Sequence, residues 1–152
     1  MITEDIVSFE IAQLLREKGF REWCSRCYGV AVLHNGSYLG FDEECELRDE
    51  GRENEIEYVK DGMLYDMNCN NSDEDAKVWA APTLGVTMKW LREVHKVMIV
   101  PIPISFKKKI GYNKWRCELY IEGVFEHMNS KFSTYEEAVE AAIKSCLINL
   151  IK

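Results

Sequence analysis

The C-terminal part of the chain carries the pattern that most constrains the fold, an apolar stripe at helical spacing. A capping box at 133–136 starts it, because the side chains of Ser133 and Glu136 satisfy each other's free backbone amides. The stripe itself consists of Val139, Ala142, Ile143, Cys146, Leu147 and Leu150. A helix with such a stripe draws its stability from packing, so the rest of the chain must supply a covering layer.

A strand pattern just upstream predicts that layer. Its buried face is formed by the alternate residues Trp115, Cys117, Leu119 and Ile121. Gly123 allows a bend into a second strand, 124–128. Residues 97–104 form a strand at a sheet edge or a bulge, because Pro101 and Pro103 cannot donate ladder hydrogen bonds. We predict that the final helix packs on the buried face of the first of these strands.

Two further helices are predicted nearer the N-terminus. Ser8 caps one that ends at Gly19, and Thr83 caps another that runs to about His95. The sequence thus predicts an α+β fold with three helices packed on a mostly antiparallel sheet, ordered α-β-β-β-α in its C-terminal part. With 152 residues and no internal repeat, the chain is predicted to form a single domain over 1–152.

The segment 42–75 differs from the rest of the chain in its charge. It holds fourteen acidic and three basic residues, a net charge of −11, whereas the remainder of the chain carries +4. Asp61-Gly62 predicts a hairpin between 56–59 and 63–65, and residues 42–54 are predicted to form a solvated loop. Just before it, Asn35-Gly36 predicts a hairpin in which 37–41 pairs back on 28–33.

Composition bears on the compartment in which the protein acts. No apolar run approaches the roughly 18 residues that a membrane helix needs, and the N-terminus lacks the basic and then apolar pattern of a secretory leader. We therefore expect a cytoplasmic protein that does not bind membranes. In that reducing compartment the six cysteines are expected to be free thiols.

Motifs for metal or catalytic chemistry are incomplete. Cys24 and Cys27 have the spacing of a redox pair or half a zinc site, but no second pair accompanies them. Residues 66–70 imitate the start of a calcium loop, yet Asn71 and Lys77 stand where the turn glycine and the bidentate glutamate belong, which predicts a solvated acidic turn. The three histidines have no ligand spacing, so we expect no cofactor, metal or catalytic residue, and a small hydrolase is the least favoured alternative.

A basic and aromatic patch is the main alternative site. It consists of Phe106, Lys107, Lys108, Lys109, Tyr112 and Trp115. Such a group can hold a phosphate backbone and stack bases, but lysines also protect strand edges from aggregation. The net charge of −7 favours the protective role and argues against nucleic acid as the partner.

Two resemblances bear on function. The order α-β-β-β-α is similar to the double-stranded RNA-binding domain, but this chain has Glu136 and Glu137 where that family has phosphate-binding lysines. Three blocks resemble a family of small uncharacterised proteins from phages and integrated mobile elements of gut Bacteroidales, and these blocks are Ser8–Glu10 with Leu14–Phe20, Ala81–Thr83 with Lys89–His95, and Phe132–Ala138. The resemblance implies a genomic setting and no mechanism, and the longer acidic segment departs from it.

The leading functional hypothesis is a non-enzymatic protein that binds a host or element protein. Its acidic surface would attract a basic nuclease or DNA-binding protein, and inhibition of a host defence nuclease is one version. The candidate partner-binding residues are Asp42, Glu43, Glu44, Glu50 and Glu53. The competing interpretation is that these residues only keep a loop solvated.

Overall fold

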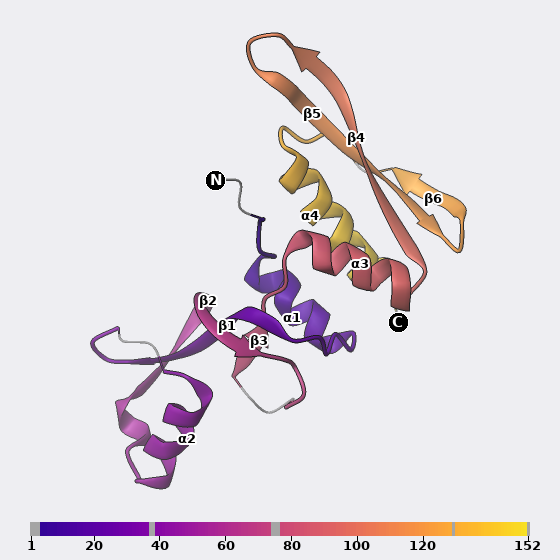
Figure 1. The fold of residues 1–152 in the computed structure, drawn as a ribbon. Helices are drawn as coiled ribbons and strands as arrows, with labels where there is room; N and C mark the ends of the chain where they lie inside the picture. Colours follow the sequence, from indigo (N-terminus) through magenta and orange to yellow (C-terminus); the bar gives the residue numbers. More distant parts are fainter. Residues whose placement is uncertain (1–3, 37–38, 74–76, 129, 152) are drawn as a thin grey trace. The chain divides into compact units, whose positions relative to one another are not determined.

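A computed structural model describes residues 4–36, 39–73, 77–128 and 130–151 (Figure 1). Within these ranges the chain forms four α-helices and two three-stranded antiparallel sheets. The α+β class is confirmed, but the predicted three helices on one sheet correspond to four helices and two sheets. The chain divides into two compact units: an N-terminal unit, Ser8–Pro82, and a C-terminal unit, Thr83–Lys152 with Met1–Val7. The single domain stays a prediction, because two compact units can unfold as one.

The C-terminal unit has the predicted order α-β-β-β-α. Its elements are α3 (Leu84–Val94), β4 (Val97–Lys107), β5 (Gly111–Ile121), β6 (Val124–Met128) and α4 (Tyr135–Ser145), followed by a π-helical turn, Cys146–Leu150. The strands lie in the order β4-β5-β6, which places the two prolines of β4 on an edge strand, as predicted. The ladder is irregular between Pro103 and Ser105, so the bulge expected near the prolines is also confirmed.

Packing of α4 on the sheet follows the two sequence patterns. Cys117 and Leu119 on β5 are fully buried, as are Val139 and Ile143 on α4 and Leu147 in the π-helical turn. The helix begins one residue later than predicted, because Thr134 and not Ser133 is its N-cap and accepts a hydrogen bond from the Glu137 N–H at 3.1 Å. Thr134 and Glu137 have the same spacing as the predicted capping box.

The N-terminal unit contains the second sheet. Its elements are α1 (Phe9–Glu17), β1 (Cys24–Leu33), α2 (Phe41–Asp49), a 3₁₀ turn (Glu53–Glu55), β2 (Ile56–Cys69) and β3 (Val78–Ala80). The strands lie in the order β2-β1-β3. Ser8 caps α1 as predicted, accepting from the Ile11 N–H at 3.3 Å. The buried Asn71 side chain donates to the Phe20 carbonyl at 3.1 Å and accepts from the Ala80 N–H at 3.0 Å, so it joins α1's end to β3.

The acidic segment differs most from its prediction. The hairpin around Asp61-Gly62 is wrong: β2 is one strand that pairs with β1 on both sides of this dipeptide, and its extra residues are accommodated where Gly29 pairs with Met63 but Ala31 pairs with Tyr58. Residues 66–69 belong to the same strand and are not a solvated turn. Pairing with the long strand β1 therefore outweighs a two-residue turn signal.

The predicted loop 42–54 is also wrong, since α2 occupies most of it. Three acidic residues in its first turn and Arg48 in its last turn suit the helix dipole, and Glu44 pairs with Arg48 one turn later. The expected return strand 37–41 is wrong in its described part, because Leu39 and Gly40 are not in a strand and Phe41 begins α2. Residues 37 and 38 lie outside the described residues.

Candidate functional site

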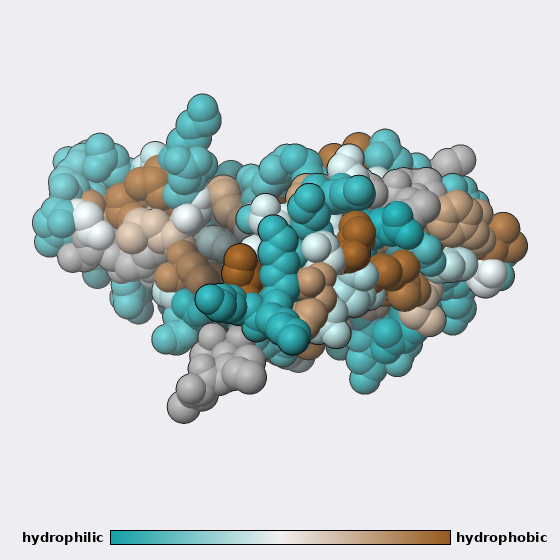
Figure 2. Space-filling view, turned by 90° about the horizontal axis from the view of Figure 1, so that it is seen from above, coloured by the Kyte–Doolittle hydropathy of each residue, from teal (hydrophilic) through white to brown (hydrophobic). Residues whose placement is uncertain are grey.

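Charge is divided unequally between the two units. The N-terminal unit holds seventeen acidic and eight basic residues, a net charge of −9. The C-terminal unit holds nine acidic and eleven basic residues, a net charge of +2. The visible face in Figure 2 is mostly hydrophilic, with apolar side chains in small separate patches. Any electrostatic attraction of a basic partner therefore belongs to the N-terminal unit.

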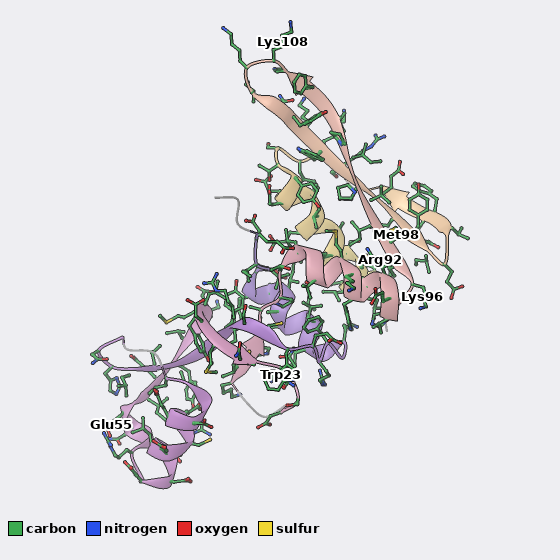
Figure 3. The ribbon with its side chains drawn as sticks, viewed as in Figure 1. Trp23, Glu55, Arg92, Lys96, Met98 and Lys108 are labelled. Carbon is green, nitrogen blue, oxygen red and sulfur yellow. The ribbon has the colours of Figure 1, made fainter. Side chains whose placement is uncertain are left out.

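A hollow of about 580 Å³ opens beside the start of α2, and we call it the acidic hollow. Its lining residues are Trp23, Gly40, Asp42, Glu43, Met67, Asn68, Cys69, Asn70, Ser72, Asp73 and Val78. Trp23, labelled in Figure 3, is 71% exposed although it is the largest side chain of the group. The carboxylates of Asp42, Glu43 and Asp73 are exposed as well.

The acidic hollow combines two groups that attract cations. Carboxylates bind guanidinium and ammonium groups by charge-assisted hydrogen bonds, and the face of an indole ring attracts the same groups through its quadrupole. The apolar lining residues Met67 and Val78 offer contact to the methylene stem of a long basic side chain. This arrangement suits an arginine or lysine side chain presented by another molecule.

Two of the five predicted partner-binding residues, Asp42 and Glu43, line this hollow. Glu44 faces inward: its side chain is 5% exposed, lies 2.8 Å from Arg48 Nη2 and accepts a hydrogen bond from the Tyr58 hydroxyl at 2.6 Å. Arg48 also donates to the Tyr58 hydroxyl. Glu44 therefore joins α2 to β2 and is not presented to a partner.

Glu50 and Glu53 lie at the far end of α2 from the acidic hollow. Glu50 forms an ion pair with Arg52 at 3.0 Å, and Arg52 also binds Glu55, which lowers the pKa of the Glu55 carboxyl. Glu53 is exposed in the 3₁₀ turn. The structure thus places Asp42 and Glu43 at the hollow, buries Glu44, pairs Glu50 with Arg52 and leaves Glu53 exposed.

Sequence reasoning missed Trp23 and Asp73. A single tryptophan between Glu22 and Cys24 belongs to no motif, and in the sequence Asp73 only adds to the charge of the segment 42–75. The pairing of β2 with β1 brings both residues close to α2. The hairpin predicted around Asp61-Gly62 does not include this pairing.

Three cysteines of the N-terminal unit lie on neighbouring strands. Cys24 is paired in register with Cys69, and a hydrogen bond with Cys69 lowers the pKa of the Cys27 thiol. Burial raises the pKa of Cys24 to about 11. All three are free, and in the part of the chain that the structure describes no group of three histidine, cysteine or acidic side chains could hold a metal ion.

The predicted basic and aromatic residues come together at the β4–β5 hairpin. The ring centroids of Phe106 and Tyr112 are 5.1 Å apart, and those of Tyr112 and Trp115 are 5.8 Å apart. Lys107 ends β4, and Lys108 and Lys109 form the turn, with Lys108 labelled at its tip in Figure 3.

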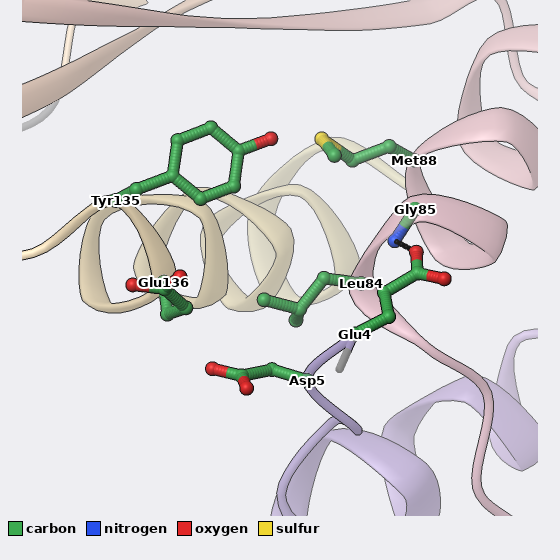
Figure 4. A pocket seen from close by; sticks show the side chains of 7 residues that line it. All are labelled: Glu4, Asp5, Leu84, Gly85, Met88, Tyr135 and Glu136. Atoms are coloured by element: carbon green, nitrogen blue, oxygen red, sulfur yellow. Dashed lines mark hydrogen bonds between the residues drawn. The ribbon is translucent and has the colours of Figure 1, made fainter. Parts of the chain in front are cut away.

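A smaller hollow of about 330 Å³ lies in the C-terminal unit between α3 and α4 (Figure 4). Its residues are Glu4, Asp5, Leu84, Gly85, Met88, Tyr135 and Glu136. The Glu4 carboxylate accepts a hydrogen bond from the Gly85 N–H at 3.0 Å, so it already occupies the N-terminus of α3. This carboxylate stabilises the start of α3 and takes the position that an anionic ligand would occupy, so we assign no ligand to this hollow.

Comparison with protein-family models, curated proteins and solved structures finds no match to this chain. Among the described helices, none is long and apolar enough to cross a membrane.

Proposed function

We propose that the protein is a non-enzymatic, protein-binding product of a phage or mobile element, and that its acidic unit binds a basic protein. The observation that carries this proposal is the acidic hollow, which is lined both by the exposed side chain of Trp23 and by the acidic residues Asp42, Glu43 and Asp73. A basic side chain entering the hollow would exchange water for an aromatic face and a carboxylate at once.

The class of partner follows from charge. A unit with a net charge of −9 speeds its encounter with a basic protein and suppresses binding to acidic ones. Nucleases and DNA-binding proteins present basic surfaces, so a host defence nuclease is a partner of suitable chemistry. The phage or mobile-element setting rests on the resemblance of the three sequence blocks.

The test uses two variants with the same change of charge. Asp42→Asn with Glu43→Gln neutralises the acidic hollow, whereas Glu17→Gln with Asp61→Asn neutralises two exposed carboxylates outside it. Each tagged protein is incubated with host lysate at low and at moderate salt, and recovered proteins are identified by mass spectrometry. The affinity of each recovered basic protein is then measured with purified components.

We expect the hollow variant to lose its basic partner and the control variant to keep it. Trp23→Ala, which leaves the charge unchanged, should weaken the same partner at both salt concentrations, since an aromatic contact is not screened as a surface charge is. Equal weakening by the hollow variant and the control would mean that only overall charge matters, and the hollow would then have no specific role.

A further inference from the structure

We infer that the tip of the β4–β5 hairpin binds single-stranded nucleic acid, stacking unpaired bases on its aromatic row and holding phosphates with its lysines. The aromatic row consists of Phe106, Tyr112 and Trp115. This inference concerns the C-terminal unit alone and does not depend on the acidic hollow.

Irregularities in the ladder place the three rings on one face. Tyr112 and Trp115 are three residues apart, a spacing that puts side chains on opposite faces of a regular strand. In this hairpin Ser105 pairs with Lys114 but Phe106 pairs with Tyr112, so Asn113 is an extra residue in β5. The extra residue shifts the alternation by one, as a β-bulge does, and the rings of Tyr112 and Trp115 come within 5.8 Å.

At one end of the aromatic row α4 covers Trp115, and toward the hairpin tip the other two rings are exposed. Trp115 packs edge-on against Tyr135, the first residue of α4, with ring centroids 5.2 Å apart. Farther along, Tyr112 is 58% exposed and Phe106 is 61% exposed, and Figure 1 shows the hairpin extending past the start of α4. Exposed neighbouring aromatic rings are costly in water and are the feature by which many proteins stack unpaired bases.

The segment that bears the row contains only basic charged residues. Residues 94–117 include six basic residues and no acidic one. Of these, Lys107, Lys108, Lys109 and Lys114 are exposed on the hairpin. The net charge of −7, which at first argues against nucleic acid, is concentrated in the N-terminal unit, while the unit that bears this hairpin carries +2. The objection from overall charge therefore does not apply to the hairpin.

The neighbouring carboxylates decide which form of nucleic acid fits. Glu136 and Glu137 are exposed in the first turn of α4 and would repel a phosphate backbone that ran over that helix start. A duplex, which presents its phosphates to a wide surface and hides its bases, gains little here. A single strand can follow the lysines of the hairpin and turn its bases onto Phe106 and Tyr112.

The experiment measures binding of the full chain to labelled oligonucleotides of about 12 residues by fluorescence anisotropy. The probes are an oligodeoxythymidine, an oligouridine and a duplex of mixed sequence. We expect both single strands to bind at low salt about tenfold or more tightly than the duplex, and binding to weaken as salt rises. The ratio of the two single-strand affinities tells whether RNA or DNA is preferred.

Two variants test the roles of the rings and the lysines. Phe106→Ala with Tyr112→Ala changes exposed side chains and should weaken single-strand binding about tenfold or more while leaving the melting midpoint close to that of the parent. Lys108→Gln with Lys109→Gln should weaken binding and flatten its dependence on salt. The matched control, Lys18→Gln with Lys60→Gln, removes the same charge from the N-terminal unit. It should change neither the affinity for the single strand nor the salt dependence of binding.

Three results would overturn the inference. They are absence of binding at low salt, tighter binding of the duplex, and full single-strand affinity in the variant that lacks both rings.

Discussion

Gly62 on β2 lies against the ring of Phe9 so closely that a side chain has no room there. A Cβ added at Gly62 would lie 2.6 Å from Cδ1 and 2.7 Å from Cγ of Phe9. The ring is held in place by Tyr28 and Trp79, whose ring centroids lie 5.4 Å and 5.2 Å away. Gly62 is therefore needed for the close approach of α1 to β2, and it does not form a turn.

Gly62→Ala is expected to destabilise the protein by about 1–3 kcal/mol, because the added methyl group forces the clamped Phe9 ring to move. Urea denaturation followed by circular dichroism measures this loss. In a Phe9→Ala background the same substitution should cost clearly less, since the two positions are coupled. An equal cost in both backgrounds would show that crowding by Phe9 is not the cause.

Glu44→Gln tests the buried contact between α2 and β2. The carboxylate of Glu44 binds both Arg48 and Tyr58, and its loss should lower the free energy of unfolding by about 1–3 kcal/mol. The control is Glu46→Gln, an exposed position on the same helix, which should change the stability by less than about 0.5 kcal/mol. Similar small effects at both positions would mean that Glu44 belongs to the solvated surface after all.

Leu147→Ala tests the packing of the C-terminal stripe. Leu147 is fully buried, so its truncation should cost about 2–5 kcal/mol through lost burial and the cavity left behind. The next residue, Ile148, is 52% exposed, and Ile148→Ala should have a much smaller effect on the thermal midpoint. If both variants had the same thermal midpoint as the parent, the stripe would not be part of the core.

The sequence predicted the C-terminal unit well because its signals are local. Alternation along β5, the capping residues of α3 and α4 and the apolar stripe each determine one element without help from distant residues. The N-terminal unit was predicted less well for the opposite reason. Gly62 looks like half of a turn in the sequence, and only the position of Phe9 explains it. The helix α2 has few apolar residues to mark a buried face, so its pattern resembles that of a solvated loop.

The candidate site was predictable only in its charge. Asp42 and Glu43 follow from the acidic composition, but the same composition includes Glu44, which is buried. The ion pair with Arg48 and the contact with Tyr58, fourteen positions away, separate Glu44 from its neighbours. Trp23 reaches the hollow through strand pairing, which no local pattern reports.

His95 makes the stability of the protein depend on pH. It is the C-cap of α3 and packs edge-on against Trp90 with ring centroids 4.6 Å apart. A protonated histidine at a helix C-terminus is favoured by the dipole, but here burial lowers the pKa of His95 below its usual value. The unfolded chain therefore takes up the proton more readily than the folded one. The stability that neutral His95 supports is present above about pH 6.5 and is lost as the pH falls through the folded-state pKa.

The measurement is the free energy of unfolding by urea between about pH 7 and pH 5.5, above the range in which ordinary carboxyl groups titrate. His95→Gln should flatten the decline toward low pH, because glutamine takes up no proton in either state. A parent protein whose stability is constant over this range, or a His95→Gln variant that keeps the full decline, would contradict the role assigned to His95.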